Sequence, residues 1–113
     1  MWKSLGFVCA MALVAGGTSC SGDANDPQSA RVGRGRQVYL TNCTACHAQD
    51  PSQPGPVGPE VGSSSLELLR AKVLRNEYPP GYSPKRDTKA MIPLVHLEPE
   101  LEALAAFLAQ HPD

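Results

Sequence analysis

The pentapeptide at positions 43–47, Cys-Thr-Ala-Cys-His, restricts the possible folds of this chain more than any other feature of its sequence. This C-x-x-C-H spacing is the arrangement of a covalent haem attachment site. Two residues between the cysteines allow both sulfurs to reach the two vinyl groups along one edge of the macrocycle, and the histidine then lies beneath the iron. We therefore expect one haem c, bound through Cys43 and Cys46 with His47 as an axial ligand.

Other uses of the same cysteines explain fewer of the residues. A dithiol redox site is expected within a strand–helix–strand pattern, and the chain has no convincing strand. A zinc site needs four ligands, but the other histidines, His96 and His111, form no paired motif. A disulfide between Cys43 and Cys46 is possible in an exported protein, but it leaves His47 without a role. Haem attachment gives a role to all three residues.

The first twenty residues have the composition of a secretory leader. Lys3 precedes an apolar run over residues 5–16, which is too short for a comfortable membrane span. Cys20 follows three small residues, in a stretch that resembles the processing site of a bacterial lipoprotein, and an acylated cysteine there would tether the domain to a membrane. Ordinary leader cleavage is the alternative. We expect a leader over residues 1–20, a polar tether over 21–30 and one domain over 31–113, exported to the bacterial periplasm.

Composition and charge narrow the possible functions further. The chain has ten Lys and Arg against eleven Asp and Glu, and because Lys3 lies in the leader, acidic residues outnumber basic ones by two beyond it. This balance gives no support to nucleic-acid binding. A domain of fewer than a hundred residues buries only about three fifths of the surface that its unfolded chain exposes. A porphyrin would supplement so thin a core.

Three segments have helical patterns. Residues 30–40 place Gly35 and Tyr39 on one face, and we expect them to cross a last helix that opens at Pro99 and carries a stripe of leucines with Phe107 beside it. Between them, Ser64 has capping-box spacing to Glu67 and precedes a helix that should end by position 78. The prolines within 50–62 and 78–87 predict rigid loops.

The second axial ligand of the iron is predicted to be Met91. It is the only methionine beyond the leader and lies in an irregular segment ahead of the last helix. A methionine that merely fills the core is the alternative. His96 is the second choice for the ligand, and its use would give a bis-histidine iron. We expect His111 to have no ligand role.

The chain resembles the class I c-type cytochrome family, in particular its small bacterial mono-haem members. The resemblance covers residues 31–110 and depends on the motif at 43–47, on Gly35 and Tyr39 ahead of it, on Gly-Pro-Glu-Val-Gly at 58–62, on Met91 and on the terminal helix. It implies an all-α cytochrome c fold, with three to four short helices wrapped around one covalently bound haem and long proline-rich loops.

The resemblance also implies roles for further residues. The carbonyl of Pro59 would accept the imidazole N–H of the haem histidine, and Val61 belongs to the same haem-contacting segment. Some members place a tryptophan near a haem propionate. The chain has none beyond the leader, so Tyr78, Tyr82 or Arg75 would take that place.

The expected function is therefore that of a single-electron carrier and not of an enzyme. Its partners would be redox proteins, reached through an exposed haem edge. Six basic residues could surround this edge and bind the partner, or they could simply be solvated: Arg70, Lys72, Arg75, Lys85, Arg86 and Lys89. We call the first interpretation a docking rim. Two alternative functions remain, an electron-relay subunit of a larger membrane or periplasmic oxidoreductase, and a haem sensor or weak peroxidase with a labile Met91.

Overall fold

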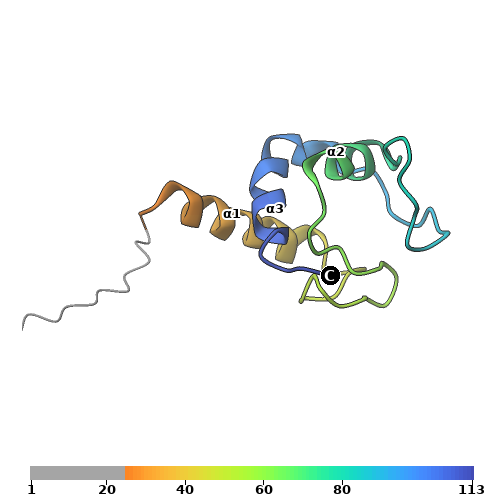
Figure 1. Ribbon diagram of the computed structural model, residues 1–113, viewed down its shortest axis with the longest axis horizontal. Coiled ribbons are helices and arrows are strands. Elements are labelled where there is room, and N and C mark those ends of the chain that lie inside the picture. The colour runs from red at the N-terminus through yellow and green to blue at the C-terminus, as the bar shows by residue number, and fades with distance from the viewer. Residues whose placement is uncertain (1–24) are drawn as a thin grey trace, which may run out of the picture.

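The computed structural model describes residues 25–113, which form helices and long loops, with no strand in that part of the chain (Figure 1). The elements are α1 (Pro27–Asn42), α2 (Leu66–Arg75), the 3-10 helix η1 (Val95–Glu100) and α3 (Leu101–Leu108). The predicted all-α class is confirmed. The expected leader and Cys20 lie outside the described residues. None of the helices between residues 25 and 113 is long and apolar enough to cross a membrane.

Helix α1 begins earlier than its sequence pattern predicts. Asp26 is its N-cap, and a carboxylate oxygen of Asp26 accepts the N–H of Ser29 at 2.9 Å. Pro27 then occupies the first helical position, where its missing N–H has no partner to lose. Residues 27–30, expected to belong to a tether, are therefore the first turn of the helix, and that part of the prediction is wrong.

The crossing of α1 and α3 forms the centre of the fold (Figure 1). The rings of Tyr39 and Phe107 lie 5.5 Å apart between centroids, in a tilted arrangement. A Cβ at Gly35 would lie 2.8 Å from the Cβ of Phe107 and would collide with the backbone carbonyl of Ala103. The predicted crossing is confirmed, and it depends on the missing side chain at Gly35.

Helix α2 has a different cap from the one predicted. Ser65 precedes it, and the Ser65 hydroxyl accepts the N–H of Leu68 at 3.1 Å. Ser64 does not cap the helix, because its hydroxyl donates to the carbonyl of Val61 at 2.6 Å and so belongs to the preceding turn. The helix ends before Asn76, which adopts the left-handed conformation with φ of 55°.

The last helical region has two parts. Pro99 lies inside η1 and does not open α3, which begins at Leu101 and continues directly from η1. The predicted apolar stripe of α3 is confirmed, because its large side chains are all buried: Leu101, Leu104, Phe107 and Leu108. α2 packs against η1 and α3, and its Leu69 and Val73 join the same core. Partly buried side chains at the edge of this core include Cys43, Val61, Met91 and Leu94.

Candidate functional site

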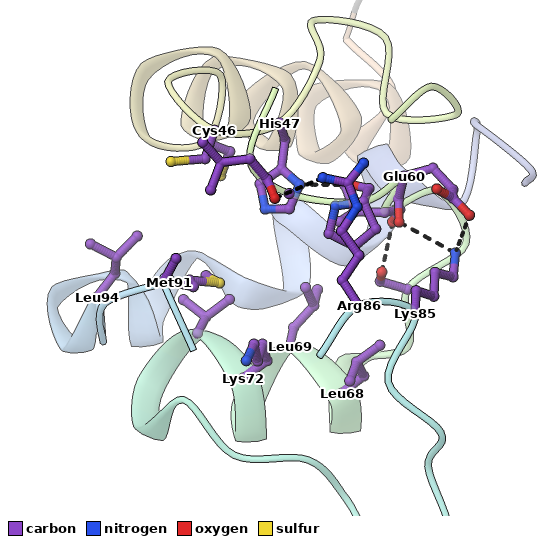
Figure 2. Close-up of a pocket in the computed structure, with 18 of the residues that line it drawn as sticks. Cys46, His47, Glu60, Leu68, Leu69, Lys72, Lys85, Arg86, Met91 and Leu94 are labelled. Atoms are coloured by element: carbon purple, nitrogen blue, oxygen red, sulfur yellow. Dashed lines mark hydrogen bonds and ion pairs between the residues drawn. The ribbon is translucent and has the colours of Figure 1, made fainter. Parts of the chain in front are cut away.

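A cavity of about 410 Å³ opens between the turn after α1, helix α2 and the loop that follows α2 (Figure 2). Its wall is predominantly apolar, with Leu69, Val73 and Leu104 of the core exposed to it. Eight of the site residues predicted from the described part of the chain line this one cavity: Cys43, Cys46, His47, Pro59, Val61, Tyr78, Tyr82 and Met91. The structure therefore brings together residues as far apart in the sequence as positions 43 and 91.

The turn that carries the two cysteines is a direct continuation of α1. The N–H of Cys43 donates to the carbonyl of Tyr39 at 2.9 Å, and the N–H of His47 donates to the carbonyl of Cys43 at 2.9 Å. The Tyr39 hydroxyl donates to the carbonyl of Ala48 at 2.5 Å, directly after His47. Both ends of the turn are thus fixed to one buried tyrosine.

The thiols of Cys43 and Cys46 are half-buried and are not joined by a disulfide. Burial raises the pKa of the Cys43 thiol to about 11. A nucleophilic dithiol requires a thiol with a lowered pKa. The surroundings of Cys43 therefore do not favour the dithiol redox alternative.

Residues 55–59 fold back over this turn. The N–H groups of Val57 and Gly58 both donate to the carbonyl of Cys46, at 3.2 and 2.9 Å. Gly58 then lies against the imidazole of His47, and a Cβ at this position would lie 2.8 Å from the ring Nε2. Only glycine leaves the ring its observed place. Sequence reasoning assigned no role to this glycine, although its position directly before Pro59 is a usable signal.

The orientation of His47 is fixed by Pro59. Nδ1 of His47 lies 2.8 Å from the carbonyl oxygen of Pro59, so the predicted contact is present. A carbonyl can only accept, so Nδ1 is the donor, which is the tautomer in which a neutral imidazole keeps the lone pair on Nε2. The lone pair of Nε2 is then available to a metal, which is the usual arrangement of a ligating histidine with a hydrogen-bonded second nitrogen.

Met91 lies across the cavity from His47 (Figure 2). It is half-buried and packs against the edge of the core. The loop that carries it returns to α2 at Leu94, whose N–H donates to the carbonyl of Val73 at 2.7 Å. His96, the alternative ligand, is exposed on η1 and does not line the cavity. Met91 is the residue that the fold places with His47.

A stack of side chains forms the wall between α2 and the loop after it. The rings of Tyr78 and Tyr82 are nearly parallel at 7°, with centroids 5.3 Å apart. Nζ of Lys72 lies 4.3 Å from the centroid of Tyr78 and donates to Oδ1 of Asn76 at 2.7 Å. Arg75 is not part of this wall, because it faces Glu77 at 3.0 Å outside the cavity. Of the residues suggested in place of a tryptophan, the two tyrosines line the cavity.

Two further cations, Lys85 and Arg86, lie on the side of the cavity away from Cys46 (Figure 2). Burial lowers the pKa of Lys85, but its hydrogen bond to Asp113 and the charges of Asp113 and Glu60 outweigh that effect, so the pKa is raised. Lys85 is therefore charged at neutral pH. Lys85 and Arg86 also bind backbone carbonyls, of Glu60 and Val57, which no sequence pattern predicts because every residue has a carbonyl.

The six basic residues expected at a docking rim do not share one environment. Lys72, Lys85 and Arg86 line the cavity, whereas Arg70, Arg75 and Lys89 are exposed outside it.

The number of donors that the cavity offers can be compared with the number that each kind of iron or zinc site requires. Within residues 25–113 no group of three or more His, Cys, Asp and Glu side chains is placed to hold a metal ion. A haem needs only one or two axial ligands from the protein, and a zinc site needs three or four.

In comparisons with protein-family models, curated proteins and solved structures, the chain has no match.

Proposed function

We propose that this protein is a mono-haem c-type cytochrome with a cytochrome c fold and that it carries single electrons between redox proteins. One observation supports this most strongly. The two thiols of the C-x-x-C-H motif, an imidazole with its Nδ1 proton held by Pro59, and a methionine sulfur all border one apolar cavity. Each of these features has a separate role in holding a haem c.

The residues of the chain would divide the work as follows. Cys43 and Cys46 would form the two thioether bonds, while His47 and Met91 would supply the protein ligands of the iron. Pro59 keeps the imidazole in one orientation. When bound, the haem supplies the one-electron oxidation and reduction. The apolar wall would limit the access of water to the bound haem, which would favour the ferrous state and a raised potential.

The presence and stoichiometry of the haem are tested on protein purified after export. A pyridine haemochrome assay should give one haem c per chain, and acid acetone should leave the pigment on the protein, because thioether bonds survive this extraction. Cys43→Ser and Cys46→Ser variants should lose covalent pigment. A colourless wild-type protein would contradict the proposal.

The axial ligands are tested by substitution at positions 91 and 96. Ferric wild-type protein should show a weak sulfur–iron band near the red end of the visible spectrum, and Met91→Ala should abolish it. His96→Ala is the matched control and should retain the band, because His96 is exposed and outside the cavity. Loss of the band in the His96 variant alone would exclude the ligand pair proposed here.

Export and membrane attachment are a separate part of the proposal. A leader over residues 1–20 and lipidation of Cys20 would hold the domain at a membrane of the bacterial periplasm. Mass spectrometry of the mature N-terminus should find an acylated Cys20. An unmodified terminus from ordinary leader cleavage would leave a free periplasmic carrier, and co-purification with a larger complex would favour the relay-subunit alternative.

A further inference from the structure

Lys85 and Arg86 are consecutive residues that hold one short backbone segment. Nζ of Lys85 lies 3.3 Å from the carbonyl oxygen of Glu60, 3.6 Å from the Glu60 carboxylate and 2.6 Å from the Asp113 carboxylate. The guanidinium of Arg86 donates to the carbonyl of Val57 at 2.7 Å and to that of Gly55 at 3.5 Å. The two cations thus contact residues 55–60 at both ends, and Figure 2 shows the contact of Lys85 with Glu60.

This segment is the one that orients His47. Val57 directly precedes Gly58, which lies against the imidazole, and Glu60 directly follows Pro59, which accepts the Nδ1 proton. The carbonyls that Lys85 and Arg86 bind therefore flank the two residues that position the ring. A shift of this segment would move the hydrogen-bond acceptor of His47.

The same two cations belong to the loop that carries Met91. This loop leaves α2 at Asn76 and returns to it at Leu94. Between Arg86 and Leu94 the hydrogen bonds found are weak or local ones, from Nδ2 of Asn76 to the carbonyl of Lys89 at 3.4 Å and from the N–H of Ala90 to Thr88 at 3.2 Å. The position of Met91 therefore depends strongly on the contacts of Lys85 and Arg86 before it and on the hydrogen bond of Leu94 after it.

We propose that Lys85 and Arg86 are positioning residues that couple the two ligand-bearing segments, holding the Met91 loop to the segment that orients His47. The inference rests on the proposed function, since it concerns the ligands of the haem. A charge-assisted hydrogen bond is stronger than a neutral one, so Arg86, with two carbonyl acceptors, should contribute most. Lys85 is more exposed to solvent, which weakens its ion pairs.

The test is a titration of the ferric protein with imidazole, which competes with the Met91 sulfur. The sulfur–iron band reports how much Met91 is displaced. Arg86→Gln should raise the apparent imidazole affinity about tenfold, and Lys85→Gln should raise it about threefold. Lys89→Gln is the matched control, because its side chain is exposed in the same loop, and it should bind imidazole as the wild type does. Arg86→Lys keeps one donor and should lie between the wild type and Arg86→Gln.

Hydrogen exchange gives a second readout that does not depend on the iron. The hydrogen-bonded amides of Gly55, Val57 and Gly58 should exchange faster in Arg86→Gln than in the wild type, while those of the α1–α3 crossing should not change. Unchanged imidazole affinity together with unchanged exchange in both Gln variants would overturn the inference. The haem content of the wild type tests the proposed function separately. If the wild type holds one haem per chain but the Gln variants bind imidazole as it does, only the coupling is refuted. A wild type without haem refutes the function. If a Gln variant does not retain haem, its hydrogen exchange and the imidazole titration of Arg86→Lys provide the test.

Discussion

The imidazole of His47 lies against Gly58 and occupies the space into which a Cβ at position 58 would project. Pro59, the next residue, accepts the Nδ1 proton of the same ring at 2.8 Å. One face of the histidine and one of its nitrogens are therefore fixed by two consecutive residues. This leaves Nε2 as the nitrogen available to a ligand in the cavity.

Gly58→Ala should displace the His47 ring. The φ angle of Gly58 is not positive, so alanine is compatible with the backbone and the effect is one of space. Overpacking of this kind destabilises a protein by about 1–3 kcal/mol. Urea unfolding should show this loss, and the haemochrome assay should show less haem per chain. A variant with normal stability and full haem content would show that the ring has another acceptable position.

Two glycines of α1 should respond in opposite ways to alanine. At Gly35 a Cβ would collide with the carbonyl of Ala103 in α3, whereas at Gly33 nothing lies within 4 Å of it. Gly33→Ala should stabilise the protein by about 0.5–1 kcal/mol, because alanine is the better helix former. Gly35→Ala should destabilise it by about 1–3 kcal/mol despite the same gain in propensity. Urea unfolding of the two variants, measured side by side, tests whether the helices cross at Gly35; equal effects would argue against it.

Tyr39→Phe should weaken the fold and change its response to alkali. Burial, with smaller contributions from the charges of Cys43 and Asp50, raises the pKa of Tyr39 to about 12. In the unfolded chain the phenol of Tyr39 ionises near pH 10. The contribution of neutral Tyr39 to the stability of the fold is therefore fully present below pH 10 and is lost as the pH rises from about 10 to about 12.

The phenylalanine variant lacks both this titration and the hydrogen bond to Ala48. It should be less stable at pH 7 by about 1 kcal/mol. Its stability should also fall less between pH 9 and 11 than that of the wild type, as measured by chemical unfolding at each pH. Parallel curves for the two proteins would contradict the raised pKa.

Features that depend on local chemistry or on side-chain spacing were predictable from the sequence. The apolar stripe of α3 and the small residue at Gly35 were sufficient to predict which helices cross. The contact between His47 and Pro59 followed from the family resemblance, because it joins two short motifs. Met91 was predicted by elimination, and the fold places it at the cavity with His47.

Features that depend on one hydrogen bond among several possible ones were not predictable in the same way. Ser64 and Ser65 are both able to cap α2, and the choice is made by the turn at Val61, which takes the Ser64 hydroxyl. The start of α1 was missed because Asp26 and Pro27 were interpreted by composition and not as a cap followed by a first helical residue. The contacts of Arg86 are with backbone carbonyls, which no side-chain pattern marks.

The ion pair between Arg34 and Glu100 should make stability depend on acid. Arg34 of α1 donates to both carboxylate oxygens of Glu100 at the end of η1, with Nε 3.0 Å from one of them. The Arg34 hydrogen bond lowers the pKa of Glu100, against a smaller opposing effect of burial. A lowered pKa means that the ionised Glu100 stabilises the fold above the pKa of a glutamate in the unfolded chain, about 4.3. This contribution is lost as the pH falls through the pKa of the folded protein.

Between pH 6 and pH 3 the stability of the wild type, measured by urea unfolding, should therefore fall more than that of Glu100→Gln. Glu102→Gln, a change at an exposed residue two positions further on, should follow the wild type. High salt should reduce the difference because it screens exposed charges. An acid response of Glu100→Gln equal to that of the wild type would show that the pair does not join α1 to η1 in solution.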